Sequence, residues 1–147
     1  MNKPKVLFLC TGNSARSQMA EGLLRALAND HFDVFSAGMK PKGSILSEVK
    51  EVMREAGIDI SAQYSKSVME YLGKQVFAHV ITVCADAEEN CPAVFLNIGT
   101  HAHFPFDDPA KFGGETRLAS TRHVYDQIEA RLRLWLAGQR IPPKDYR

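Results

Sequence analysis

The sequence predicts an α/β fold in which a four-stranded parallel sheet carries helices on both faces. Short apolar runs that are typical of buried strands, such as residues 6–9, alternate with segments whose apolar residues recur at helical spacing. Strands that alternate with helices in this way pair in parallel, and the connecting helices cover both faces of the sheet. The chain has 147 residues, the size of one domain, so we expect a single domain over residues 1–147.

The expected elements follow from the period of the apolar residues. Runs of apolar and β-branched residues predict four strands, at residues 6–9, 32–36, 78–83 and 100–106. Apolar residues three or four positions apart predict four helices, at residues 17–29, 45–56, 67–72 and 115–136. Gly57 and Gly138 follow the second and the last of these helices, and glycine commonly ends a helix. The segment between Cys91 and Gly99 favours no regular element.

The composition argues against several classes of partner. The net charge is +1, which gives no indication of a nucleic acid or an anionic membrane as partner. No apolar run approaches the roughly 18–20 residues that cross a bilayer, and the run before Cys10 is too short for the core of a signal peptide. We therefore expect a cytoplasmic protein whose thiols stay reduced. Three cysteines in that compartment are more often reactive or metal-binding than structural.

The segment between the first strand and the first helix carries the strongest functional pattern. Cys10 is followed six residues later by Arg16, and the residues between them are Thr11, Gly12, Asn13, Ser14 and Ala15. Gly12 permits backbone angles that other residues avoid, and Asn13 tolerates the left-handed region. A tight loop of this kind turns its N–H groups inward to bind an anion. The positive end of the next helix and the planar guanidinium of Arg16 favour a tetrahedral oxyanion.

The same surroundings suit Cys10 as a nucleophile. They stabilise the thiolate, so its pKa is expected to fall from about 8.5 to roughly 3.5–7.5. Ser17, at the helix start, can donate a hydroxyl hydrogen bond to that thiolate, and Asn13 can brace the loop. A structural interpretation stands beside this one, because cysteine is often only a small buried apolar residue. A nucleotide-binding loop is disfavoured, since it needs a lysine where this chain has Ser17 and Gln18.

Three residues that can carry chemistry each follow a strand of the expected sheet. Cys10 follows the first strand, Cys84 the third and Asp108 the fourth. Ligands of parallel sheets bind beyond the C-terminal ends of the strands. We therefore expect these three residues on one rim of the sheet.

Asp108 is a candidate general acid. Attack of Cys10 on a tetrahedral oxyanion must protonate a leaving oxygen, and a carboxylic acid above the loop can supply the proton. Aspartate is ionised at pH 7 unless the site or the bound anion raises its pKa. Taken alone, the run Asp107-Asp108-Pro109 favours a simple turn over an acid.

Cys84 and Cys91 are not needed by an enzyme that uses Cys10 alone, whereas a reductase must deliver two electrons. Each also has an ordinary interpretation, as a core residue or as chance spacing. A zinc site with the pair His101 and His103 is disfavoured, because paired ligand spacing is missing. If residues 86–91 are helical, the two Cα atoms lie roughly 10 Å apart, beyond the ~4.4–6.8 Å of a disulfide. Oxidation should therefore unwind this segment.

The pattern Cys-x5-Arg-Ser after the first strand resembles the low-molecular-weight tyrosine phosphatases. The longer run CTGNSARSQMAE, residues 10–21, is still more similar to the arsenate reductases that share that fold. The resemblance runs from about residue 5 to residue 135 and implies a three-layer sandwich that forms one catalytic domain. It also implies that the general acid is an aspartate directly before proline. That position is Asp108, with Asp107 as the less favoured neighbour.

The run CADAEENCP, which begins at Cys84 and includes Cys91, looks like the cysteine pair of the thioredoxin-coupled arsenate reductases. The resemblance implies that Cys10 attacks arsenate while Asp108 protonates the departing water. Cys84 then attacks the sulfur of the Cys10–arsenic adduct and releases arsenite. Cys91 attacks the resulting disulfide at Cys84, and the Cys84–Cys91 disulfide passes to thioredoxin. No cofactor is implied.

Other functions and reductants stay open. A low-molecular-weight phosphatase is the main alternative, although such phosphatases carry aromatic residues after the acid, where this chain has Ala110 and Lys111, with Phe112 one step later. A reductase with residual phosphatase activity is also expected. An anion-binding or redox-sensing module would keep the loop without turnover, and Asp108 argues against it. Thioredoxin is favoured by the cysteine spacing over glutaredoxin or another thiol. We expect a monomer.

One position departs from the family. Several of its reductases hold a potassium ion beside the loop through Asn, Ser, Thr and Asp oxygens. Asn13 and Ser36 match two of these positions, and Tyr64 and Lys66 stand at the other two. A lysine in place of an acidic ligand argues against a bound cation. Lys66 either places its ammonium there and braces Asn13, or points to solvent as most lysines do.

Overall fold

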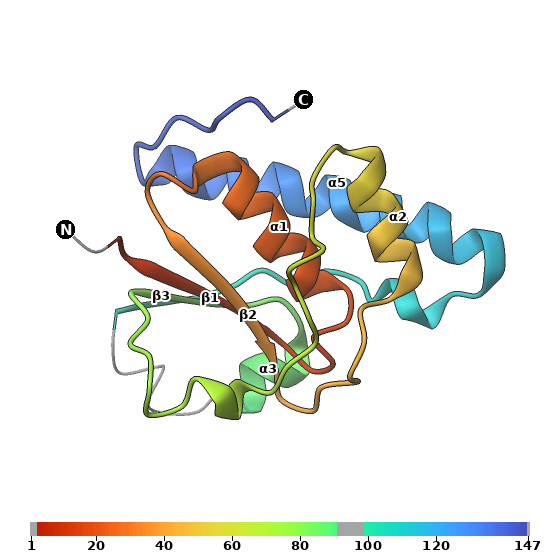
Figure 1. Cartoon of the computed structure of the whole chain (residues 1–147), viewed down its shortest axis with the longest axis horizontal. Helices are drawn as coiled ribbons and strands as arrows, with labels where there is room; N and C mark the ends of the chain where they lie inside the picture. Colours follow the sequence, from red (N-terminus) through yellow and green to blue (C-terminus); the bar gives the residue numbers. More distant parts are fainter. Residues whose placement is uncertain (1–2, 91–98, 147) are drawn as a thin grey trace.

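Four parallel strands form the centre of the molecule. The computed structural model describes residues 3–90 and 99–146. Within them the strands are β1 (Lys5–Cys10), β2 (Asp33–Gly38), β3 (His79–Thr82) and β4 (Thr100–His103). They lie in the order β2-β1-β3-β4, and every neighbouring pair is parallel (Figure 1). The predicted α/β fold with a four-stranded parallel sheet is therefore confirmed.

Helices connect the strands. They are α1 (Arg16–Ala28), α2 (Ser47–Glu55), α3 (Ala85–Asn90) and α5 (Gly114–Gly138). Two further turns are 3-10 helices, at Val68–Glu70 and Pro109–Lys111. The helix predicted over 67–72 is thus a single 3-10 turn, which the Ser67 side chain caps by accepting from the N–H of Met69. The last helix continues through Gly138, and the left-handed backbone that follows it lies at Arg140, with φ of 60°.

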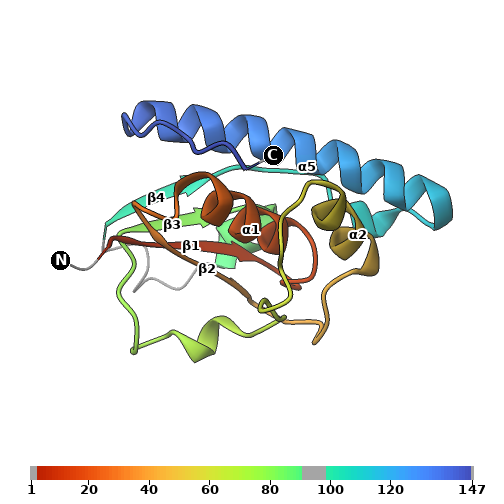
Figure 2. The ribbon, with the colours of Figure 1, turned by 45° about the horizontal axis from the view of Figure 1, so that its top comes forward.

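The order of the strands decides which helix covers which face. The crossover from β1 to β2, which contains α1, runs in one direction along the sheet, and the crossover from β3 to β4, which contains α3, runs in the opposite direction. Right-handed crossovers of opposite direction place their helices on opposite faces. Helix α1 accordingly lies on one face, where α2 and α5 pack beside it, and α3 lies on the other face (Figure 1 and Figure 2). The strand order reverses between β1 and β3, which is the position where sheets of this kind open a binding crevice.

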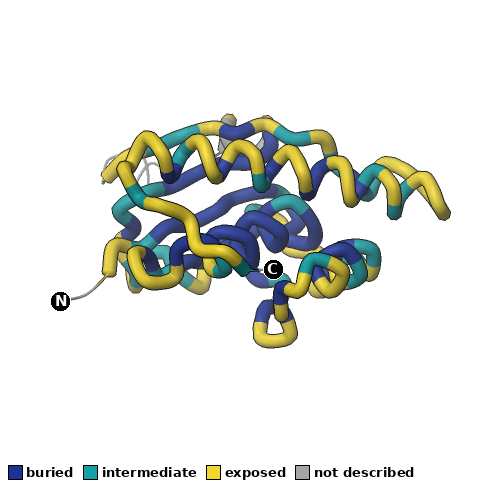
Figure 3. Tube along the Cα trace, turned by 90° about the horizontal axis from the view of Figure 1, so that it is seen from above, coloured by how far each residue is buried: buried dark blue, intermediate teal, exposed yellow. Residues whose placement is uncertain are grey.

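The core lies between the sheet and the helices. The apolar run of β1 is fully buried, at Val6, Leu7, Phe8 and Leu9. The long helix α5 presents a stripe of buried residues to α1 and the sheet and keeps its other side in solvent (Figure 3). The C-terminal segment lies along the molecule, where the N–H of Lys144 donates to the carbonyl of Leu27. No helix within the described ranges is long and apolar enough to cross a membrane.

Candidate active site

The loop from Cys10 to Arg16 joins β1 to α1 and turns its carbonyl groups outward. Asn13 adopts a left-handed backbone, with φ of 48°, as its residue type predicts. The carbonyls of Cys10, Thr11, Gly12 and Ser14 accept from backbone N–H groups of the segment after β2, namely those of Met39, Lys40, Lys42 and Leu46. Because these carbonyls face away, the N–H groups of the loop are left for an anion, together with the start of α1.

Two glycines allow this packing, for steric reasons. Gly12 does not have a positive φ, so the expectation that it uses a glycine-only backbone is wrong. A Cβ there would instead come within 3.1 Å of the Lys42 side chain, which passes over the loop. At Gly38, the end of β2, a Cβ would lie 2.7 Å from the carbonyl oxygen of Thr11. The close approach of β2 to the loop therefore requires a residue without a side chain.

The thiol of Cys10 lies at the bottom of the loop, where only 3% of the residue is exposed. Its Sγ lies 2.8 Å from Ser17 Oγ and accepts from the N–H of Asn13 at 3.1 Å. Burial raises the pKa of this thiol, and the contacts with Ser17 and Asn13 and the charge of Arg16 act in the opposite direction. The net shift is upward, so the predicted lowering is wrong in this geometry, because burial outweighs the stabilisation of the thiolate.

Arg16 and Asp108 close one side of the oxyanion pocket. Arg16 Nη1 donates to the carbonyl of Phe106 at 3.1 Å, and Nη2 lies 3.7 Å from Asp108 Oδ2. The other carboxylate oxygen of Asp108 accepts from the N–H of Ala110 at 3.0 Å. Asp108 therefore initiates a turn and also faces the pocket, so the two interpretations of this residue are compatible. Asp107 is exposed.

Cys84 contacts the loop from the neighbouring strand. It is 5% exposed, and its Sγ lies 3.4 Å from Thr11 Oγ1. The convergence of Cys10, Cys84 and Asp108 on one rim, expected because each follows a strand of a parallel sheet, is observed in the structure. Cys91 lies outside the described residues. The helix expected between the two cysteines is observed as α3, which begins directly after Cys84.

Two members of a buried polar network behind the loop, Gln18 and Glu21, were not identified from the sequence. Asn13 Nδ2 donates to Ser17 Oγ at 2.8 Å and to Ser36 Oγ at 3.0 Å. Ser36 donates to Glu21 Oε1 at 2.5 Å, and Gln18 Nε2 donates to Asn13 Oδ1 at 2.9 Å. The available signal was that Gln18 and Glu21 lie three positions apart on a helix face whose neighbours are apolar. Polar residues on such a face are buried only when they have partners.

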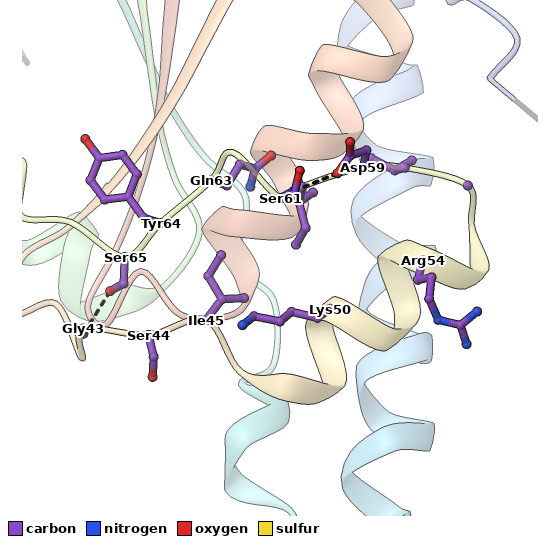
Figure 4. Close-up of a pocket in the computed structure, with 13 residues that line it drawn as sticks. Gly43, Ser44, Ile45, Lys50, Arg54, Asp59, Ser61, Gln63, Tyr64 and Ser65 are labelled. Atoms are coloured by element: carbon purple, nitrogen blue, oxygen red, sulfur yellow. Dashed lines mark hydrogen bonds between the residues drawn. The ribbon is translucent and has the colours of Figure 1, made fainter.

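The cavities around the loop differ in size and lining. The oxyanion pocket has a volume of about 260 Å³, and Lys40, Lys42 and Asp108 line it with the loop. A neighbouring pocket of about 300 Å³ is lined by Cys84, Arg16 and Asp108 among others. A larger cavity of about 850 Å³ lies between α2 and the segment that follows it (Figure 4). The rim lysines were missed by the sequence analysis, because their place depends on the contact of two distant loops.

Metal ligands do not gather at this rim. Among residues 3–90 and 99–146, no group of three or more His, Cys, Asp or Glu side chains is placed to hold a metal ion. His103, one of the two histidines considered as zinc ligands, lies with its Nδ1 2.8 Å from Thr82 Oγ1.

Comparisons with known proteins agree with this geometry. The family model of low molecular weight phosphotyrosine protein phosphatases matches residues 5–144. An arsenate reductase of Halalkalibacterium halodurans is 44% identical over 135 residues, which cover 90% of this chain and 95% of that protein.

Solved structures give the same result. A structure described as an arsenate reductase in the phosphate binding state has a TM-score of 0.78 at 28% identity, and the match covers 92% of this chain and 98% of that one. A thioredoxin-dependent arsenate reductase of Corynebacterium glutamicum has a TM-score of 0.70 at 29% identity, over 93% of this chain and 62% of that one. The chain therefore belongs to the low molecular weight phosphotyrosine protein phosphatase family, and its relatives there include arsenate reductases.

Proposed function

We propose that this chain reduces arsenate to arsenite through a thiol relay that begins at Cys10. The observation that carries the proposal is the position of Cys84, whose sulfur lies 3.4 Å from the Thr11 hydroxyl of the oxyanion loop. A phosphatase needs only the loop and an acid, whereas a reductase needs a further thiol beside the nucleophile. The relatives named arsenate reductases support the same choice of substrate.

In the first step the Cys10 thiolate attacks arsenic in arsenate, which is bound by the loop N–H groups and by Arg16. An arsenic–sulfur bond forms, and an oxygen of arsenate leaves as water. Asp108 lines the same pocket and supplies the proton to that oxygen. Its carboxylate oxygen Oδ2 lies 3.7 Å from Arg16 Nη2, so the acid and the guanidinium face the same bound anion.

In the second step Cys84 provides the electrons. Its thiolate attacks the sulfur of the Cys10 adduct, the arsenic–sulfur bond breaks, and the bonding electron pair stays on arsenic. Arsenic is thereby reduced from the +5 to the +3 state and leaves as arsenite, while a Cys10–Cys84 disulfide forms. Cys84 is well placed for this attack, because it reaches the loop from the end of β3, next to β1.

In the third step Cys91 attacks the disulfide at Cys84 and releases the Cys10 thiolate. The resulting Cys84–Cys91 disulfide accepts two electrons from a dithiol protein, for which we propose thioredoxin, as in the relative from Corynebacterium glutamicum. All groups of this relay belong to one chain, so we propose that a monomer suffices. The relay needs reduced thiols, which agrees with the proposed cytoplasmic location.

A residual phosphatase activity is part of the proposal. The loop, Arg16 and Asp108 would accept phosphate esters, since phosphate and arsenate are both tetrahedral oxyanions. After the acid the chain has Ala110 and Lys111, and Phe112 is 40% exposed. We therefore expect slow hydrolysis of small aryl phosphates and no dependence of that hydrolysis on Cys84 or Cys91.

The coupled assay tests the function. Oxidation of NADPH by thioredoxin reductase and thioredoxin should depend on arsenate with the wild-type chain. The rate should be lost in Cys91→Ser, which keeps the loop and its acid. Aryl phosphate hydrolysis by the same variant serves as the control, because it should be unchanged. If NADPH oxidation does not depend on arsenate, the chain is a phosphatase, and if the variant matches the wild type, Cys91 has no part in the relay.

A further inference from the structure

Lys66 is a buried cation beside the catalytic loop, to which the proposed reaction gives no role. It follows α2 in the chain and is 5% exposed, so the expectation that it points to solvent is wrong. Its Nζ donates to the carbonyl of Tyr64 at 2.8 Å and to Ser36 Oγ at 3.4 Å. It also lies 3.7 Å from Glu21 Oε1, and both side chains of this pair are almost fully buried.

The surroundings of this ammonium group are those of a monovalent cation. A carbonyl, a hydroxyl and a carboxylate oxygen converge on Nζ, and each of them would also serve as a ligand of a hard cation. The family resemblance implies a potassium ion in this region. These residues do not fit such an ion, because the ammonium of Lys66 already lies among Tyr64 O, Ser36 Oγ and Glu21 Oε1.

We propose that Lys66 is a positioning residue, a covalently attached cation that holds Ser36 and Asn13 in the orientation by which Ser17 stabilises the Cys10 thiolate. The inference rests on the proposed role of Cys10 as nucleophile and does not depend on arsenate as the substrate. Lys66 acts through Ser36 and through the loop, and it does not touch the reacting atoms.

The path from Lys66 to the nucleophile consists of hydrogen bonds between buried groups, and the longest of them, at 3.4 Å, is the first. Lys66 Nζ donates to Ser36 Oγ, which also accepts from Asn13 Nδ2 at 3.0 Å. The same amide group donates to Ser17 Oγ at 2.8 Å, which leaves the Ser17 hydroxyl proton for Cys10 Sγ, also at 2.8 Å. The backbone N–H of Lys66 reaches the network as well, because it donates to Asn13 Oδ1 at 3.0 Å.

The charge of Lys66 is balanced by Glu21. The Ser36 hydroxyl donates its proton to Glu21 Oε1 at 2.5 Å. The lone pairs of Ser36 Oγ are therefore left to accept from Lys66 Nζ and Asn13 Nδ2. The pKa of Lys66 is lowered by burial, although the charges of Glu21 and Glu70 act in the opposite direction. Arg25 Nη2 lies 2.7 Å from the other carboxylate oxygen of Glu21, Oε2. Glu21 Oε1 therefore faces Ser36 and Lys66. Removing the ammonium would leave the buried negative charge of Glu21 less well neutralised, and Ser36 Oγ would lose one of its two hydrogen-bond donors.

The test measures Cys10 itself, with iodoacetamide as a neutral alkylating probe. Alkylation of Cys10 at pH 7, followed by mass spectrometry of its peptide, should be about tenfold slower in Lys66→Met, the change that one pKa unit produces. Ser36→Ala breaks the same path without removing the charge and should slow alkylation similarly. Lys74→Met makes the same chemical change at an exposed site and should leave the rate unchanged.

The second part of the test replaces the missing ammonium group of Lys66 with a free ammonium ion. Lys66→Ala opens space among the three oxygens, so ammonium chloride should restore alkylation. The tetramethylammonium ion is too large to enter this space, so its chloride at equal ionic strength should not restore alkylation. Neither salt should speed the alkylation of Cys10 in the wild type.

Several results would overturn the proposal. Alkylation profiles of Lys66→Met and Ser36→Ala that match the wild type, with only their thermal unfolding altered, would reduce Lys66 to a structural role. Equal effects of the two salts on Lys66→Ala would contradict the cation-binding geometry. Alkylation of Cys10 in the wild type that rises with potassium chloride but not with sodium chloride would also contradict it. None of these readouts requires arsenate, so they remain informative if the proposed reduction is wrong.

Discussion

At the scale of single residues, the chemistry of the site depends on how Cys10 is ionised. Burial disfavours the thiolate, and the Ser17 hydroxyl is the strongest of the groups that oppose this effect. Because the pKa of the thiol lies above its ordinary value, the thiolate fraction and the rate of alkylation should rise with pH through a range higher than that of an exposed cysteine.

Replacing Ser17 should shift this titration further upward. Ser17→Ala removes a hydrogen bond to a charged group, for which a contribution of about 1.5 kcal/mol corresponds to about one pKa unit. Alkylation of Cys10 by iodoacetamide at neutral pH should therefore be about tenfold slower, with the pH midpoint moved upward. Ser44→Ala, at an exposed serine, is the matched control. A midpoint that moves downward would contradict the assignment of Ser17 as donor.

The second residue-level prediction concerns the acid. Asp108→Asn keeps an oxygen for the N–H of Ala110 but cannot deliver a proton, so the rate of formation of the Cys10 adduct should fall by about 100- to 10,000-fold. Binding of phosphate, measured by calorimetry, should be retained. Asp107→Asn changes the exposed neighbour in the same way and should have little effect. If the two variants exchange these behaviours, Asp107 is the acid.

Local spacing in the sequence identifies some of these residues and not others. Cys10, Asn13 and Arg16 lie in one short loop, so their relation is present in the sequence itself. Glu21 and Lys66 become partners only because α1 and the segment after α2 pack together, and single-sequence periodicity carries no information on that contact. The predicted lowering of the Cys10 pKa was wrong for the same reason, because the burial that raises this pKa depends on tertiary packing.

At the scale of secondary structure, the long helix α5 supports the site from behind and contributes only Gln127 to the pocket beside Cys84. Its buried residues pack against α1, the helix that begins at the oxyanion loop. Periodicity predicted this helix well, because apolar residues at helical spacing extend over many turns. The predicted helix at 67–72 is a single 3-10 turn, since so short a segment contains too few positions for a period to decide.

A substitution on the buried side of α5 should reduce stability. Leu132 is completely buried, and Leu132→Ala should lower the free energy of unfolding by about 2–5 kcal/mol in urea titrations. Leu134, two positions along, is 66% exposed, and Leu134→Ala should change that free energy by no more than about 0.5 kcal/mol. Comparable losses from the two variants would show that the described orientation of the helix is wrong.

Helix α3 should respond to the redox state. Its six helical residues separate Cys84 from the position of Cys91, and a helix keeps two such Cα atoms too far apart for a disulfide. Amide protons of residues 85–90 should therefore exchange faster in the oxidised than in the reduced protein. Amides of β1 serve as the internal control and should exchange equally in both states. Equal protection of residues 85–90 would contradict the proposed unwinding.

At the scale of the whole molecule, the topology of the sheet brings the reacting groups together. The reversal of strand order between β1 and β3 places Cys10 and Cys84 next to each other, although 73 positions separate Cys84 from Thr11, which it contacts. This convergence could be predicted, because alternating strands and helices define a parallel sheet and parallel strands end on one rim. Periodicity could not predict the network that surrounds Lys66, since it needs the placement of three separate segments. The family resemblance supplied the positions of Asn13, Ser36 and Lys66 beside the loop but not that of Glu21.

A single turnover without any external reductant tests the relay most directly. The fully reduced chain is mixed with one equivalent of arsenate, and the reaction is quenched in acid. The disulfides of the chain are then mapped by mass spectrometry, and the amount of arsenite released is measured. The account predicts one arsenite per chain, a Cys84–Cys91 disulfide in the wild type, and a trapped Cys10–Cys84 disulfide in Cys91→Ser. Arsenite release with all three thiols still reduced, or a wild-type chain that forms no disulfide with arsenate, would contradict it.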